Sequence, residues 1–91
     1  MPTYDYSRLP ANMRGGMQRY LEQGLRPGGC LTAILANDLL GAVGRADETT
    51  LAGLWSICAF IHSHAPGNAY GSYEAVDEWC KAGGINRGEE A

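Results

Sequence analysis

The sequence lacks any long apolar run, and its beginning lacks the pattern of a secretory signal. A membrane-spanning helix needs about 20 mostly apolar residues in succession, and no stretch of the chain provides them. Met1 and the residues after it offer neither the basic nor the apolar segment of a signal peptide. We therefore expect a cytoplasmic protein that does not enter a membrane. Its 91 residues allow one domain, with an N-terminal arm at 1–8 and a flexible tail at 86–91.

Cysteine is scarce and widely spaced. Cys30, Cys58 and Cys80 form neither a C-x-x-C pair nor a zinc-type spacing with the two histidines. We predict three reduced, buried thiols, no metal site and no cofactor. Cys58 and His62 are four residues apart and share one helix face, which leaves open a small thiol hydrolase. A core or rim histidine is the plainer interpretation, because no orienting acid or oxyanion motif accompanies the pair.

Lysine is almost absent, with one residue against six arginines, and the formal net charge is −3. Residues 1–45 carry five basic and three acidic side chains, whereas residues 46–91 carry two basic and seven acidic ones. An acidic chain is a poor general binder of nucleic acids, which require a basic face. Arginine suits bidentate recognition of carboxylate or phosphate. Surface solubility is the plainer explanation of the same residues.

Strand-like alternation of apolar and polar residues is also missing, whereas helical periodicity recurs along the chain. We predict an all-α fold, a compact single-domain bundle of about four helices. Gly24 is predicted to be a left-handed C-cap, Ser72 to be an N-cap, and Gly83–Gly84 to end the last helix. The predicted helices run from Pro10 to Gln23, from Pro27–Gly29 to Val43, from Asp47 to Ser63 and from Tyr73 to Ala82.

The first three predicted helices carry apolar side chains at helical spacing, and we expect those side chains to be buried. The third is apolar over most of its circumference, so we expect protein on all sides of it. The expected core residues include Met13, Met17, Tyr20 and Leu21, then Leu31, Ile34, Leu35, Leu39 and Val43, and finally Leu51, Leu54, Trp55, Ile57, Cys58, Phe60 and Ile61.

Asn37 and Asp38 form an adjacent amide–acid pair in the middle of the second predicted helix. Both residues are poor helix formers there, because their side chains compete for backbone hydrogen bonds. A carboxylate that is even partly buried needs a cationic or N–H partner, and Arg14, Arg19 and Arg45 are the candidates. A structural ion pair is one interpretation. In the other, the Asn–Asp pair lines a surface for a ligand or partner.

The segment Arg26-Pro27-Gly28-Gly29 precedes the second predicted helix. Exposed amides at a helix start, two glycines and an arginine together can hold an anion such as phosphate. The phosphate-binding pattern G-x-x-x-x-G-K-[ST] is absent, and a simple turn between helices is the plainer interpretation.

Aromatic residues gather near the last predicted helix, at Tyr70, Tyr73 and Trp79. With Tyr4 and Tyr6 in the arm, they outnumber the single phenylalanine. Aromatic and arginine side chains dominate the energetics of protein interfaces, although these rings could equally close a small core.

The stretch from Leu9 to Asp47, followed by the stretch from Ala65 to Ile85, resembles a family of short helical phage and prophage proteins. The resemblance covers about residues 8–85 and implies no activity, cofactor or catalytic residue. Cys30 occupies a position where the family pattern has an aromatic residue. The matching positions are Arg19, Tyr20, Leu21, Glu22, Gly24, Pro27, Gly28, Leu31, Thr32, Ala33, Asn37, Asp38, Leu39, Gly71, Ser72 and Trp79.

This resemblance implies a setting in which small acidic proteins act by binding, often against host defence. We therefore expect a non-enzymatic phage-type accessory protein that antagonises antiviral defence by stoichiometric binding of a host immune component. The alternatives are an oligomer that sequesters a phosphorylated or cyclic-nucleotide signal, and the thiol hydrolase. A homo-oligomer, most simply a symmetric dimer, is expected. The candidate binding residues are Arg14, Arg19, Arg26, Gly28, Gly29, Asn37, Asp38, Arg45, Tyr70, Tyr73 and Trp79.

Overall fold

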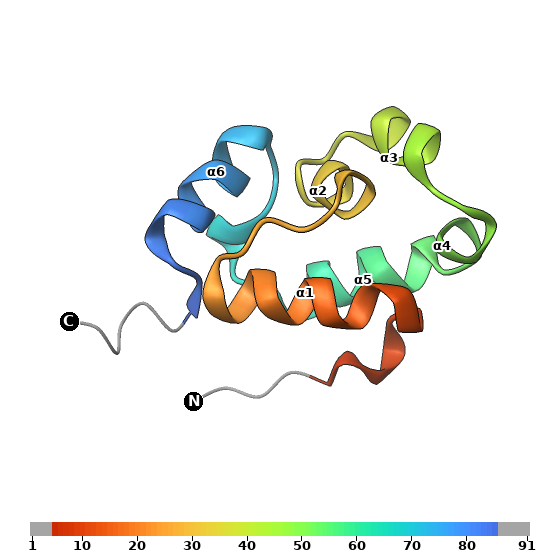
Figure 1. Ribbon diagram of the computed structural model, residues 1–91, viewed down its shortest axis with the longest axis horizontal. Helices are drawn as coiled ribbons and strands as arrows, with labels where there is room; N and C mark the ends of the chain where they lie inside the picture. Colours follow the sequence, from red (N-terminus) through yellow and green to blue (C-terminus); the bar gives the residue numbers. More distant parts are fainter. Residues whose placement is uncertain (1–4, 86–91) are drawn as a thin grey trace.

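A computed structural model describes residues 5–85, and this part of the chain folds into α-helices and short 3-10 helices without any strand (Figure 1). The predicted all-α class is confirmed. The predicted number of helices is too small, because two of the four predicted helices are each broken into two. The elements are η1 (Tyr6–Arg8), α1 (Ala11–Gln23), α2 (Gly29–Leu35), α3 (Leu39–Arg45), α4 (Glu48–Ala52), α5 (Leu54–His64), η2 (Gly67–Ala69) and α6 (Tyr73–Ala82).

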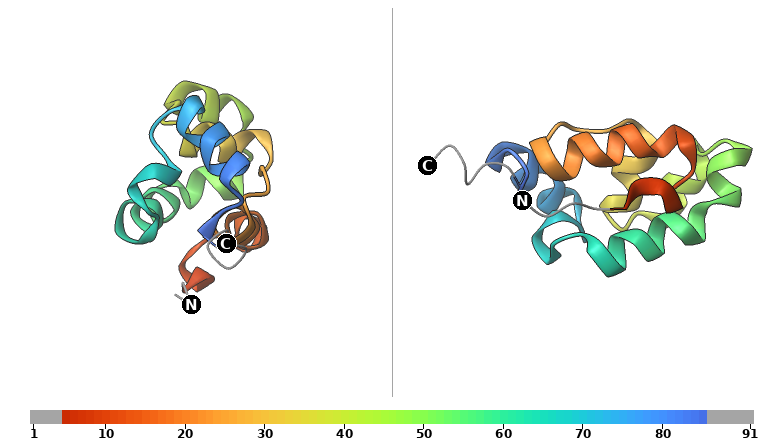
Figure 2. Two further views of the ribbon diagram at one scale, coloured as in Figure 1. Left: turned by 90° about the vertical axis from the view of Figure 1, so that its left-hand side faces the viewer. Right: turned by 90° about the horizontal axis from the view of Figure 1, so that it is seen from below.

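The two longest helices, α1 and α5, run along the long axis of the molecule, with α2 and α3 above them and α6 across one end (Figure 1). Viewed from below, α1 and α5 lie along opposite sides, and η1 lies between them (Figure 2). The core fills the space that these elements enclose. Its most completely buried large side chains are Tyr20, Leu9, Met17, Leu21, Leu35, Ile57 and Val76.

Helix α1 forms as its sequence predicts. Met13, Met17, Tyr20 and Leu21 are all buried, which confirms the expected apolar stripe. The helix ends at Gly24, whose φ of 72° is left-handed and whose N–H donates to the carbonyl of Tyr20 at 2.9 Å. Glycine adopts this conformation without steric cost, so the chain can reverse at this residue.

The second predicted helix is wrong as a single element, because the chain turns at Asn37. This residue has a φ of 63°, and asparagine tolerates the left-handed region better than most residues. The N–H groups of Asn37 and Asp38 donate to the carbonyls of Ile34 and Ala33, which is the hydrogen-bond pattern of a Schellman C-cap. The Asp38 carboxylate then accepts from the N–H of Gly41 at 3.0 Å and begins α3.

This turn changes which side chains of the segment are buried. Leu31 and Leu35 of α2 lie in the core as predicted, and Ile34 packs partly against it. Beyond the turn the prediction is wrong, because Leu39 and Val43 are exposed and Ala42 is the buried residue of α3. Helix α3 therefore presents its large apolar side chains outward.

The third predicted helix is also broken, at Gly53, where α4 ends and α5 begins. A side chain at Gly53 would collide with the ring of Pro10, so glycine allows the start of α1 to pack directly on this junction. Asp47 caps α4 by accepting from the N–H of Thr50 at 2.8 Å. The expectation that protein surrounds this region is wrong, since Trp55 and Cys58 are exposed.

The last helix, α6, has the bounds that the sequence predicts. The Ser72 hydroxyl accepts from the N–H of Ala75 at 3.0 Å, and Gly83 ends the helix with a φ of 89°. The described part of the N-terminal arm forms the 3-10 helix η1, which Asp5 caps by accepting a hydrogen bond from the N–H of Ser7. Tyr4 and the predicted tail at 86–91 lie outside the described residues.

The C-terminal ends of α1 and α6 meet backbone to backbone. A Cβ built on Gly24 would lie 2.7 Å from the nitrogen of Gly84 and 2.8 Å from the carbonyl carbon of Gly83. Close by, the indole Nε1 of Trp79 donates to the carbonyl of Tyr20 at 2.9 Å, and the Tyr20 hydroxyl donates to the carbonyl of Ala69 at 2.6 Å. These contacts hold α6 and η2 against α1.

Candidate functional site

A groove of about 380 Å³ lies between α1 and the segment that leads into α2. Helix α1 contributes one wall, and the chain from Leu25 to Leu31 contributes the other. The groove brings together four of the predicted binding residues, namely Arg19, Arg26, Gly28 and Gly29. The remaining lining residues are Asn12, Met13, Gly16, Leu25, Pro27, Cys30 and Leu31.

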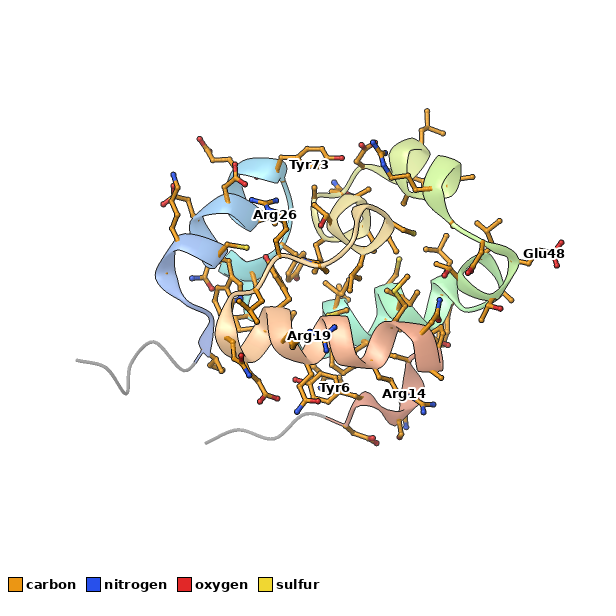
Figure 3. All side chains as sticks on the ribbon, in the orientation of Figure 1. Tyr6, Arg14, Arg19, Arg26, Glu48 and Tyr73 are labelled. Carbon is orange, nitrogen blue, oxygen red and sulfur yellow. The ribbon has the colours of Figure 1, made fainter. Side chains whose placement is uncertain are left out.

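The two arginines of the groove have different surroundings. A Cβ on Gly15 would lie 3.0 Å from Nη1 of Arg19, so the guanidinium rests over the bare backbone of that glycine. Within residues 5–85 Arg19 forms no ion pair. Arg26 pairs with Asp77 of α6, and both side chains are about half exposed. Figure 3 shows Arg19 on α1 and Arg26 near α6.

Arg45 approaches the same region from α3. Its side chain packs on Gly29, where a Cβ would come within 3.1 Å of the arginine Cδ, and its Nη1 donates to the carbonyl of Gly41 at 3.2 Å. Arg14 lies elsewhere, since its guanidinium donates to the carbonyls of Leu9 and Ser7 and so holds η1 on α1. Arg14 therefore has a structural contact and does not line the groove.

Among residues 5–85, Asp38 forms no ion pair with Arg14, Arg19 or Arg45, which were the candidate partners. The Asp38 carboxylate accepts from the hydroxyl of Tyr73 at 2.6 Å and from the N–H of Gly41, and these two hydrogen bonds lower the pKa of the carboxyl group. Figure 3 shows Tyr73 reaching from the start of α6 toward this turn. The Asn–Asp pair is therefore a joint between α2, α3 and α6 rather than a buried charge within a helix.

Replacing Asp38 with alanine is expected to destabilise the fold at neutral pH, with a smaller effect for Tyr73→Phe, which removes one of the two hydrogen bonds. Because folding lowers the pKa of Asp38, its contribution exists above the unfolded value of 3.8 and is lost as the pH falls. Urea midpoints at about pH 7 and about pH 3 test this, since the gap between wild type and Asp38→Ala should narrow in acid. An equal difference in urea midpoint at both pH values would mean that the charge of the Asp38 carboxylate does not contribute to stability.

Cys58 and His62 line a second hollow, of about 270 Å³, together with Asn37 and Tyr70. The prediction of three buried thiols is wrong for Cys58, which is exposed. Cys30 and Cys80 are half-buried, and none of the three cysteines forms a disulfide with another. Partial burial raises the pKa of the Cys58 thiol and so opposes the thiolate that nucleophilic catalysis requires. The hollow therefore brings Cys58 and His62 together, but its surroundings do not lower the pKa of the Cys58 thiol.

Five large apolar side chains on α3, α4 and α5 are exposed, and we call them the α3–α5 surface. Leu40 is 83% exposed, Trp55 80% and Leu39 62%. Helices α3 and α4 and the start of α5 occupy one end of the long axis (Figure 1). The α3–α5 surface consists of Leu39, Leu40, Val43, Leu51 and Trp55.

None of these five residues was among the predicted binding residues. Helical periodicity assigned Leu39, Val43, Leu51 and Trp55 to the core, because the breaks at Asn37 and Gly53 were not foreseen. The usable signal was the run of residues from Asn37 to Gly44, in which two poor helix formers and two glycines interrupt the apolar pattern. Trp79, in contrast, was a predicted binding residue and lies in the core.

Over residues 5–85, no three histidine, cysteine, aspartate or glutamate side chains converge in a way that could hold a metal ion. No helix in this range has the length and apolar character needed to cross a membrane. Comparisons with protein-family models, curated proteins and solved structures gave no match.

Proposed function

We propose that this chain is a non-enzymatic protein that antagonises a host antiviral defence by stoichiometric binding of one of its protein components. The α3–α5 surface is the observation that carries the proposal. Single exposed apolar residues are normal on protein surfaces, but five large ones on three successive helices, including an indole and a leucine that are each at least 80% exposed, are unusual. Both would gain most of their burial only in a complex.

Helix α3 supports this assignment because its apolar face points away from the domain. Ala42 is its buried residue, whereas Leu39, Leu40 and Val43 share the outward side. Gly44 follows on this side, and a Cβ there would meet nothing within 4 Å. A partner can therefore approach the backbone closely at this point. Such a helix fits an apolar groove in the mode by which amphipathic helices bind their receptors.

The side chains between α3 and α4 are charged, with Arg45 at the end of α3 and two acids at the start of α4. Asp47 and Glu48 begin α4, and Figure 3 shows Glu48 pointing away from the molecule at this end. An apolar groove with a basic side chain opposite the start of α4 is the complementary surface. The phage setting comes from the sequence pattern that includes Arg19–Glu22 and Asn37–Leu39. The exposed apolar side chains support a protein partner, and the resemblance to phage proteins is the reason for proposing a defence protein. A second copy of this chain is the competing occupant.

Substitution of Leu40 or Trp55 with glutamate is expected to abolish defence antagonism without unfolding the protein. Both side chains are largely exposed, so the fold loses little, whereas a central interface residue contributes about 2 kcal/mol or more to binding. The measurement is phage plating efficiency on hosts that each carry one defence system and express the chain. Wild type should restore plating on at least one host, and both variants should fail.

Gln18→Glu provides the matched control, because it adds the same charge at an exposed position of α1. It should restore plating as wild type does, and all variants should melt at similar temperatures. Light scattering over a concentration series shows whether a second copy of this chain, rather than a host protein, occupies the surface. A dimer formed through this surface would be lost in the Leu40→Glu variant. Equal activity of wild type and Leu40→Glu would contradict the proposal.

A further inference from the structure

We propose that the groove between α1 and the Leu25–Leu31 segment binds a small phosphorylated molecule, with Arg19 and Arg26 contacting the phosphate. This inference is independent of the protein-binding proposal, because the groove and the α3–α5 surface share no residue. The ligand class follows from the charge, the size and the apolar part of the lining.

The lining of the groove is basic, and Asp77 of α6, outside the lining, offsets the charge of Arg26. Its lining includes Arg19 and Arg26 from opposite walls, and none of its lining residues is aspartate or glutamate. Glu22, one turn after Arg19 on α1, is engaged by the hydroxyl of Tyr6 at 2.8 Å. A guanidinium presents a planar pair of N–H donors that matches two phosphate oxygens. An arginine without an anionic partner in the protein can use both donors to bind a ligand. Arg19 is such an arginine among the described residues.

The rest of the lining fits the organic part of the ligand. Met13, Leu25, Pro27 and Leu31 form apolar surface beside the arginines. A volume of about 380 Å³ lies at the lower end of the range for small-molecule sites, which suits a mononucleotide or a sugar phosphate. The combination of apolar surface and a few convergent polar groups is the usual composition of such sites.

Two of the glycines that line the groove differ in the space beside them. At Gly16 of α1 a Cβ would lie 3.7 Å from Leu31 and 3.8 Å from Pro27, which is ordinary van der Waals contact. At Gly28 a Cβ would meet nothing within 4 Å, and the backbone has ordinary extended angles, so a larger residue fits there without strain. A side chain at Gly28 would therefore occupy space that we assign to the ligand.

Asp77 is the internal competitor for this site. Its carboxylate pairs with Arg26 at the surface, in the manner expected of the ligand phosphate. Binding must therefore displace or share Asp77, which weakens affinity. Removing this carboxylate should free Arg26 and strengthen binding of a phosphorylated ligand. A purely structural ion pair predicts no such gain.

The experiment titrates adenosine 5′-monophosphate, with adenosine as the unphosphorylated control, and follows backbone amide signals of the whole chain by NMR. Shifts are expected around Gly16, Arg19 and the Arg26–Leu31 segment with the phosphate and not with adenosine. Ribose 5-phosphate in a third titration shows whether the base contributes. Arg19→Gln is expected to weaken binding about tenfold, whereas Arg8→Gln, which makes the same charge change elsewhere, should not.

Two further variants separate the site from a general charge effect. Asp77→Asn should tighten binding severalfold, and Gly28→Leu should block it, whereas Gly67→Leu at an equally open position should leave it unchanged. Equal shifts with adenosine, or equal losses in Arg19→Gln and Arg8→Gln, would overturn the assignment. Weaker binding by Asp77→Asn in a folded protein would also overturn it.

Discussion

Replacing Gly24 with alanine is expected to destabilise the fold by about 3 kcal/mol or more, a large part of the roughly 5–14 kcal/mol that holds a domain of this size together. Two effects add at this residue. Its φ of 72° is unfavourable for any residue with a Cβ, and that Cβ would press on the backbone of Gly83 and Gly84. The neighbouring atoms belong to the main chain, so a side-chain rotation cannot relieve the collision. Urea denaturation measures the loss.

Gly24→Asn separates the two effects, because asparagine tolerates the left-handed region and still places a Cβ against α6. We expect this variant to be nearly as unstable as Gly24→Ala. Recovery of most of the stability would instead assign the effect to the backbone angle alone. Gly67→Ala is the neutral control, since its Cβ would meet nothing within 4 Å.

The second large effect is expected at Tyr20, which is completely buried. Tyr20→Phe removes the hydroxyl that donates to the carbonyl of Ala69, leaves that buried carbonyl without this partner, and should cost about 1–3 kcal/mol. Tyr20→Ala also removes the ring that packs near Trp79 and should cost about 3–5 kcal/mol. Denaturant midpoints of the two variants give the contributions of the hydroxyl and the ring.

Alkaline pH provides an independent check. Burial raises the pKa of Tyr20 above its ordinary value of 10, so the folded state binds this proton more tightly than the unfolded state. Its contribution is therefore complete below pH 10 and is lost as the pH rises further. The stability gap between wild type and Tyr20→Phe should narrow at about pH 11. A gap that widens in alkali would contradict the assignment of the hydroxyl as a buried donor.

The fold class and the ends of several helices could be read from the sequence because they depend on local chemistry. Gly24, Ser72 and Gly83 cap helices where their residue types predict caps. The breaks at Asn37 and Gly53 were missed because apolar spacing on either side remains helical in phase. At Gly53 the deciding contact is with Pro10, more than forty positions away in the sequence, which no local pattern reveals.

The candidate sites were predictable to different degrees. Arg26 and the glycines of the Pro27–Gly29 segment were identified as anion-binding candidates and Arg19 as a candidate binding residue, and the structure brings them into one groove. The contact between the Arg19 guanidinium and the backbone of Gly15 depends on the side-chain conformation of Arg19. The sequence does not determine that conformation. The α3–α5 surface was missed, because the exposure of its residues follows from the breaks at Asn37 and Gly53, which end one helix and begin another.

The contact between Gly24 and Gly84 also limits how far the protein can fold while it is being synthesised. About sixty residues separate the two glycines, and the indole of Trp79 that caps the carbonyl of Tyr20 is equally distant in the sequence. A nascent chain that has exposed only its first five helices lacks these partners. The domain can therefore complete its fold only after α6 has been translated and has left the ribosome. Until then, the contacts between α1 and α6 cannot form.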